Sequence, residues 1–424
     1  MTTLHFSNAR LIDPEAGTDA VGSLTVKSGV ILARDEKAPK SAAVVDCGGK
    51  CLAPGIVDLG VKIGEPGERH RESFGSAGAA AAAGGVTTII ARPDTHPAID
   101  TPEVLEFVTR RASEAPVRIR HMAALTKHRD GREMTEIGFL RDAGAIAFSD
   151  VFRVSTEAKA ITRAMAYARS LGALVVGHPQ DPGLSAGASA TSGKFASLRG
   201  IPAVSPMAER MGLERDLALV EMTGVRYHAD QITTEKSLPA LARAKAAGLD
   251  VTAGTSIHHL TLNEFDVGDY RTFFKFTPPL RSEQDRLAMV AAVADGTIDI
   301  ISSMHSPADE ESKRLPFEDA APGAVALESF LPAAMRLYHV GHLDLPALFR
   351  AMALNPANRL GLPQGRLTLG APADLVLFDP DAPFLMDRFK LRSKSKNTPF
   401  DGARMEGKVL ATWVGGTRIF AAEE

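Results

Sequence analysis

Cysteine is almost missing from this chain, which has only Cys47 and Cys51 among 424 residues. Two cysteines four positions apart, with no companion ligands, are weak support for a zinc site, because structural zinc usually takes about four nitrogen or sulfur donors. The low count also argues against a disulfide framework. We therefore interpret the pair as reduced thiols and expect a cytoplasmic protein.

Long apolar runs and an excess of one charge are also missing. No stretch of about 18 apolar residues occurs, and the N-terminus has no basic segment followed by an apolar core, so we expect neither export nor membrane spanning. The net charge is −3, which gives no electrostatic reason to expect nucleic acid or an anionic membrane as a partner.

Several common catalytic motifs are absent. The chain has no Gly-x-Ser-x-Gly elbow, no Walker-type phosphate loop and no Gly-x-Gly-x-x-Gly that opens a helix after a strand. These absences disfavour serine hydrolases of the elbow type, P-loop nucleotidases and dinucleotide-binding enzymes.

Both ends of the chain have the pattern of short strands. Apolar and polar positions alternate in the first fifty residues, and again in 373–380 and 408–416, with Gly and Asp-Pro breaks between them. This pattern predicts that residues 1–53 and 368–424 meet in one small β-rich domain.

The middle of the chain, residues 54–367, alternates apolar runs with helical patterns. The spacing predicts strands at 87–91, 145–149, 173–177 and 298–302, and helices at 158–171 and 282–294. Repeated βα units of this kind predict a parallel sheet, and the length suits a TIM-type (β/α)8 barrel. The Ser- and Gly-rich segment 184–194 is the expected mobile loop.

The first predicted barrel strand carries the most informative motif. Residues 54–67, from Pro54-Gly55 to Pro66-Gly67, read as an apolar strand that ends in a Gly-rich loop, and this frame resembles the dihydroorotases, a branch of the metal-dependent amidohydrolases. Further landmarks of that family follow in family order: Gly84–Thr88, Pro278–Ser282, Pro316–Asp319, Asn355–Ala357 and Leu369–Leu375. The resemblance implies an amidohydrolase barrel with a zinc site at the carboxyl ends of its strands.

The residues that match the family's zinc positions have largely changed. Where the resemblance implies histidines, or for the last slot an aspartate that also acts as general base, the chain has Gly60, Lys62, Gln231 and Met304. Three positions keep a family residue type: His178, Asp150 and His305. The family often has a double Asp in the fourth-strand loop, and the sequence leaves open whether Asp150 or Val151 matches the bridging ligand.

Substrate-binding positions have changed as well. The family's arginine after the histidine pair is Gly64, and two of its asparagines are Asp94 and Thr277. Losing a bidentate arginine removes most of the binding to a carboxylate substrate, although Arg92 could restore a positive charge nearby. His258-His259 matches a family pair that does not bind zinc, and a shifted alignment that makes it a ligand remains an alternative.

This ligand tally predicts no bound metal and no cofactor, because a zinc hydrolase needs about three protein ligands and an open position for water. We expect Lys62 to point into the barrel mouth near His178 and Asp150, where its charge stands in for the missing cation. The main prediction is an inactive dihydroorotase homologue. Resemblance to the non-catalytic dihydroorotase homologues implies a hetero-oligomer with aspartate carbamoyltransferase in pyrimidine biosynthesis.

Two alternatives remain open. The first is an active dihydroorotase-like cyclic amide hydrolase with a degenerate or atypical metal site, which would hold zinc. The second is a ligand-binding regulatory module that uses the emptied pocket as a sensor.

Overall fold

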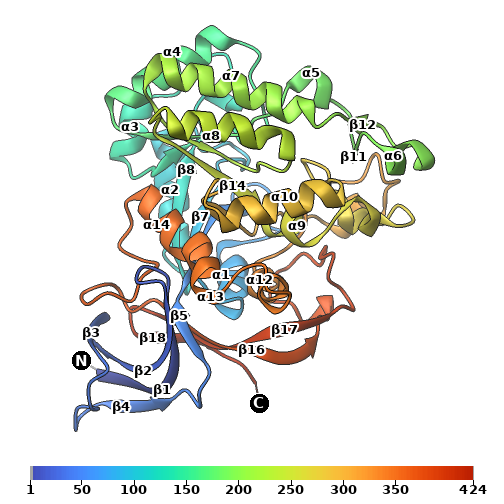
Figure 1. The fold of residues 1–424 in the computed structure, drawn as a ribbon. Coiled ribbons are helices and arrows are strands. Elements are labelled where there is room, and N and C mark those ends of the chain that lie inside the picture. Colours follow the sequence, from blue (N-terminus) through green and yellow to red (C-terminus); the bar gives the residue numbers. More distant parts are fainter. Residues whose placement is uncertain (1–2, 424) are drawn as a thin grey trace.

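The computed structural model describes residues 3–423 and contains a barrel and a terminal sheet (Figure 1). The barrel is built from eight parallel strands: β6 (Ile56–Val61), β7 (Val86–Ala91), β8 (Arg118–Ala123), β9 (Ala147–Phe148), β10 (Leu174–Gly177), β13 (Arg226–Ala229), β14 (Val251–Ser256) and β15 (Ile300–Ser302). The four barrel strands predicted from the sequence are confirmed, with ends that differ by at most two residues.

Neighbouring barrel strands pair in chain order from β6 to β15, and the two end strands then approach each other. The backbone N–H of Lys62 donates to the carbonyl of His305 at 2.9 Å. Nearby, the Asp58 carboxylate accepts a 2.8 Å hydrogen bond from the backbone N–H of Ser303. These bonds bring the first and last strands together at the edge where the functional residues of such barrels lie.

Helices surround the barrel, and several begin at side-chain caps. Ser73 caps the alanine-rich α1, and Ser282 caps α10 by accepting from the backbone N–H of Asp285. The helices are α1 (Phe74–Ala83), α2 (Pro102–Ala112), α3 (Ile137–Asp142), α4 (Ala158–Ser170), α5 (Pro182–Ser185), α6 (Lys194–Arg199), α7 (Met207–Thr223), α8 (Leu238–Ala246), α9 (Ile257–Thr261), α10 (Glu283–Ala294), α11 (Glu310–Arg314), α12 (Phe330–His339), α13 (Leu345–Phe349) and α14 (Asn355–Leu360). The predicted helices at 158–171 and 282–294 are confirmed as α4 and α10.

The two ends of the chain form the terminal sheet, as predicted. Its strand order is β18-β17-β16-β5-β1-β2-β3, with β4 beside β1, and the antiparallel pair of β5 and β16 joins the two ends. Figure 1 shows this sheet below the barrel, built from the first and the last strands of the chain. Its strands are β1 (Thr3–Asp13), β2 (Thr18–Lys27), β3 (Val30–Arg34), β4 (Ala43–Asp46), β5 (Cys51–Pro54), β16 (Leu375–Leu385), β17 (Arg404–Val414) and β18 (Thr417–Ala421).

A short arm projects from the barrel between β10 and α7 (Figure 1). It contains α5, α6 and the two-residue strands β11 (Ala190–Thr191) and β12 (Ala203–Val204), which pair in parallel. The segment 184–194 that we expected to be a loop runs through this arm and includes β11. Across residues 3–423 no helix is long and apolar enough to span a membrane.

One ion pair connects the base of the barrel to the terminal sheet. Arg118, the first residue of β8, donates from Nε to Oδ2 of Asp374 at 2.7 Å and from Nη2 to Oδ1 at 3.2 Å. The Asp374 residue is 1% exposed and also accepts from the backbone N–H of Gly415. The geometry is bidentate, which gives the strongest form of an arginine–carboxylate contact.

We predict that Arg118→Met lowers the free energy of unfolding by about 2 kcal/mol, because it leaves the buried Asp374 carboxylate without its cation. The arginine is 35% exposed, so the loss is smaller than for a fully buried pair. Chemical denaturation measures it, with the exposed Arg163→Met on α4 as the matched control. Equal unfolding midpoints for the two variants would contradict this prediction.

Candidate functional site

The residues that we singled out from the sequence do gather at one edge of the barrel. Lys62, Asp150, His178, Gln231 and Met304 each lie one to two residues beyond the carboxyl end of a barrel strand. Val151, Gln231 and Met304 also share a left-handed backbone, with φ between 49° and 56°. Such φ values are uncommon outside glycine and, in a β-branched residue such as Val151, indicate backbone strain held by the surroundings.

Two of the changed zinc positions pack against each other. A Cβ placed on Gly60 would lie 3.0 Å from Sδ of Met304, and the φ of Gly60 is +95°. Met304 is buried, at 6% exposure. The methionine side chain therefore takes up the space that a side chain at position 60 would need.

Lys62 forms ion pairs within the mouth of the barrel, but not with the partners that we predicted. Its Nζ lies 3.1 Å from Oε2 of Glu68 and 3.9 Å from Oδ2 of Asp94. The expectation that it compensates His178 and Asp150 is wrong, because Glu68 and Asp94 already hold its ammonium group.

Asp94 is shared between Lys62 and a buried arginine. Arg92 is 3% exposed and donates from Nε and Nη2 to the two oxygens of Asp94, at 3.2 and 3.0 Å. Burial alone would raise the pKa of Asp94, but Arg92, Lys62 and Arg129 together hold that pKa below its ordinary value. Position 94 therefore carries a negative charge that is shared between Lys62 and Arg92.

Asp150 is satisfied by the neighbouring strand loop. Its carboxylate accepts from the backbone N–H groups of Leu125 and Thr126, at 3.1 and 3.0 Å, and from the hydroxyl of Thr126 at 2.6 Å. Burial raises the pKa of Asp150 to about 6, although these hydrogen bonds oppose the shift. The residue thus holds the loop after β8 in place.

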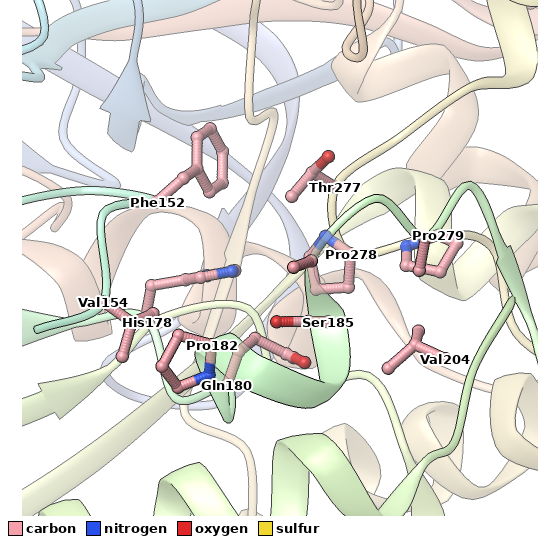
Figure 2. Close-up of a pocket in the computed structure, with 12 residues that line it drawn as sticks. Phe152, Val154, His178, Gln180, Pro182, Ser185, Val204, Thr277, Pro278 and Pro279 are labelled. Carbon is pink, nitrogen blue, oxygen red and sulfur yellow. The ribbon is translucent and has the colours of Figure 1, made fainter. Parts of the chain in front are cut away.

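His178 faces a cavity of about 240 Å³ at the barrel mouth. Figure 2 shows its imidazole pointing into this cavity, with Phe152 above it and Pro278 opposite. The rings of His178 and Phe152 meet edge to face at 5.0 Å. Burial lowers the pKa of His178 to about 3, with Arg92 and Arg281 adding to the effect, so the imidazole is neutral at physiological pH. Its Nδ1 is buried and has no hydrogen-bond partner within the described chain.

Two further buried carboxyl groups lie on the strands of this site. Asp230 follows β13, and its backbone N–H donates to the carbonyl of Gly177, which places it beside His178. Burial raises the pKa of Asp230 to about 7. Burial also raises the pKa of Asp58, on β6, to about 7, and the nearby charge of Asp230 adds to that shift. A carboxyl group that titrates near neutral pH is matched to proton transfer.

One buried carboxylate organises the loops around the cavity. Glu209 on α7 is fully buried and accepts from Thr233, Thr234 and Ser237, and from Nη2 of Arg281 at 3.4 Å. Gln180, which lines the cavity, donates to the same carboxylate at 3.5 Å. We did not single out Glu209 from the sequence, because a lone Glu in a helical pattern is usually a solvated residue.

Of the two changed substrate-binding positions 64 and 277, only position 277 places a side chain in the cavity. A Cβ on Gly64 would lie 2.3 Å from the carbonyl oxygen of Glu68, so the backbone is closed to any side chain there. Thr277 lines the cavity with His178 (Figure 2). His305 lies apart from it: its Nδ1 accepts from the N–H of Ala326 at 3.0 Å, and its Nε2 lies 3.5 Å from the buried Glu72 carboxylate.

The described residues do not fit a zinc ion with the family's ligands. Between Thr3 and Glu423, no group of three or more His, Cys, Asp or Glu side chains is arranged to hold a metal. His258 and His259 lie on the short helix α9. The ring of His258 packs against Phe276, with 4.6 Å between the ring centroids. His259 shares a 2.8 Å hydrogen bond between its Nδ1 and the hydroxyl of Ser256. This pair therefore adds no ligand cluster.

We predict that Asp230 makes the stability of the protein fall as the pH rises from about 4 to 7. Between its ordinary pKa of 3.8 and the folded value of about 7, the folded protein keeps the proton and the unfolded chain does not, so the contribution is present at low pH and lost at neutral pH. Unfolding titrations of wild type and Asp230→Asn across this range measure the difference. Asp142→Asn, at an exposed position, is the control, and parallel curves for wild type and Asp230→Asn would refute the assignment.

Comparison with known proteins places the chain among dihydroorotase-like sequences. The family profile described as dihydro-orotase-like matches residues 49–237. A dihydroorotase of Anaplasma phagocytophilum is 38% identical over 430 residues, covering 99% of this chain and 96% of the relative. A protein of Pseudomonas putida named dihydroorotase-like protein is also 38% identical, covering 98% of each chain.

Solved structures agree with this placement. The L-hydantoinase (dihydropyrimidinase) of Arthrobacter aurescens superposes with a TM-score of 0.89 at 25% identity, covering 100% of this chain and 97% of that one. The match spans the barrel and the terminal sheet together, and it confirms the predicted amidohydrolase architecture.

These relatives contradict two of our predictions. Full-length relatives that carry the name dihydroorotase overturn the interpretation of the chain as an inactive scaffold and favour the alternative of an active enzyme. Because the resemblance is to a zinc-dependent class, they also contradict the expectation of no cofactor. The predicted partner, aspartate carbamoyltransferase, stays a prediction that nothing here tests.

The sequence identity to these relatives is 34–38% along nearly the whole chain. A shared barrel alone would not identify a family, because many unrelated functions use this fold. The chain therefore belongs to the dihydroorotase-like family of amidohydrolases.

Proposed function

We propose that this protein is a dihydroorotase-like hydrolase that opens a cyclic amide, with an atypical site at the barrel mouth. The observation that carries the proposal is the cavity of about 240 Å³ into which the neutral His178 points, at the carboxyl ends of the strands. Its location matches the place where enzymes of this barrel class bind their substrates, and full-length similarity to named dihydroorotases supports the reaction class.

The cavity suits a small planar ring. Phe152, Pro278 and Pro279 supply apolar walls, while Thr277 and Gln180 supply hydrogen-bonding groups. A mostly apolar cleft with a few placed polar groups is the usual form of a small-molecule site. The ring of a cyclic amide would pack against Phe152 and turn its polar edges toward these groups.

Charge for an acidic substrate comes from Arg92. Its guanidinium lies 4.9 Å above the ring of Phe152, and its Nη1 is buried without a partner in the described residues. The two bonds to Asp94 leave this one nitrogen free to donate to an anionic group of a ligand. Arg92 thus supplies the positive charge that position 64 does not.

Asp230, which lies beside His178 through the bond of its backbone N–H to Gly177, is suited to hold or release a proton. Its raised pKa of about 7 makes both protonation states available near neutral pH. His178, with its pKa of about 3, stays neutral and acts as a hydrogen-bonding group. A zinc ion in such enzymes would activate water, but the described residues do not offer its usual ligands, so we derive no step through a metal.

We also propose a cytoplasmic location. Cys47 and Cys51 are both buried free thiols, and burial raises the pKa of each to about 12, so neither is reactive. Two neighbouring cysteines that stay reduced are typical of a reducing compartment.

We predict that the purified protein interconverts dihydroorotate and carbamoyl aspartate, and that His178→Ala reduces the rate by on the order of a hundredfold, the usual range for loss of a positioned polar group. Rates are measured by absorbance on protein prepared with added zinc and on protein treated with chelator. The exposed His342→Ala is the matched control and should keep full activity.

Two results would contradict the proposal. The first is the absence of turnover in both preparations, tested with dihydroorotate and with hydantoin and dihydrouracil as other cyclic amides. The second is turnover that His178→Ala leaves unchanged, because it would place the chemistry outside this cavity.

A further inference from the structure

A second cavity of about 240 Å³ lies beside the barrel mouth, away from the cavity that His178 lines. It forms where the loop after β6, the helix α11 and the segment 388–397 meet. The two cavities share none of their lining residues. Three lysines line the second cavity, Lys313, Lys394 and Lys396, together with Arg71, Asp309 and Glu310.

The most unusual residue in this cavity is the buried Lys313. It is 4% exposed, and its Nζ donates to the carbonyls of Ala321 and Thr272 at 2.6 and 3.1 Å. An ammonium group has three donors, so one remains for another partner. No carboxylate pairs with Lys313 in the described residues, and burial lowers its pKa to about 7, so the amino group is only partly charged at neutral pH.

Two more lysines bring unpaired charge to the same cavity. The Nζ of Lys394 donates to the carbonyl of Arg69 at 2.9 Å, and that of Lys396 to the carbonyls of Leu391 and Ser393, both at 2.7 Å. These carbonyls fix the directions of the ammonium groups but do not neutralise them. Between residues 3 and 423 neither lysine has an ion-pair partner within 4.0 Å.

The acidic residues of the cavity are already engaged. Asp309 binds Nε of Arg71 at 2.7 Å and caps α11 by accepting from Ser312. Glu310 pairs with Arg314 at 2.6 Å on the outer face of α11. Lys394 and Lys396 are therefore left as surplus positive charge, and Lys313 adds to it when a bound anion keeps its amino group protonated.

We propose that this cavity binds a small soluble anion of the phosphate class, such as a phosphate monoester or pyrophosphate. Three lysines that line one cavity suit an anion with several oxygens and more than one charge, because each amino group is a point-like donor that needs no planar partner, and a bound anion favours the protonated form of Lys313. The partly enclosed cavity and the exposed Phe389 at its rim favour a small molecule with an organic part. The proposal does not depend on the hydrolase activity.

Calorimetric titration with inorganic pyrophosphate, at constant ionic strength, tests the proposal on the full chain. We expect saturable binding at one site. The double variant Lys394→Ala/Lys396→Ala should bind at least about tenfold more weakly, a loss of about 1.4 kcal/mol. Both changes are at the protein surface or partly exposed, so the fold should survive them. The matched control is Lys159→Ala/Lys236→Ala, which removes two exposed lysines elsewhere and should bind as wild type does.

Lys313→Met provides a second test, because it removes the buried charge and keeps an apolar side chain of similar length. Thermal unfolding first checks that this variant is folded. The folded variant should bind pyrophosphate more weakly than wild type does. The proposal is overturned if wild type shows no saturable binding, or if both double variants bind alike, since equal binding means that pyrophosphate only screens the overall charge.

Discussion

The barrel mouth depends on the buried ion pair of Glu209 and Arg281. Both side chains are at most 2% exposed, and their charged atoms lie 3.4 Å apart. Arg281 also donates to the hydroxyls of Thr233 and Thr191, at 2.9 and 3.2 Å. The pair thereby ties α7, the loop after β13, the projecting arm and the segment 278–282 to each other. These are the elements that carry Gln180, Pro278 and Pro279, so the shape of the cavity follows from this pair. Breaking such a pair leaves a buried charge without compensation, which makes it a constraint on the whole edge of the barrel.

The place of the family's first-strand ligands is taken by a balanced cluster of charges. Lys62 and Arg92 face Asp94 and Glu68, so these four charges offset one another, while Arg71 adds a further cation at Glu68. Each of the four would be expensive to bury alone. Gly60 and Met304 fill the remaining space with an apolar contact. The cluster is therefore a self-consistent replacement, which explains how the barrel mouth remains folded although its ligand set has changed.

Features that depend on residues close together in the sequence were predictable, and features that depend on residues far apart in the sequence were not. The barrel strands and the terminal sheet were predictable because the periodicity of apolar residues is a local property of the chain. The position of His178 at the mouth followed from the family landmarks. The partners of Lys62 were not predictable: Glu68 lies in an irregular loop, and nothing in the sequence says that this loop turns back toward the strand end. The raised pKa of Asp230 depends on burial among distant strands, and so does the role of Glu209. The function was misjudged for a different reason, because a count of lost ligands measures the loss of one donor set and not the loss of activity.

The charged residues also connect the two proposed sites. A continuous series of ion pairs runs from Asp94 through Lys62, Glu68 and Arg71 to Asp309, with Glu68 held between Lys62 at 3.1 Å and Arg71 at 2.6 Å. Asp94 lies at one end beside Arg92, and Asp309 lies at the other end in the lysine-lined cavity. An anion bound in that cavity would compete with Asp309 and Glu68 for Arg71. Asp94, at the other end of the series, also pairs with Arg92 at 3.0 Å, so the same chain of alternating charges borders both the buried arginine and the lysine-lined cavity.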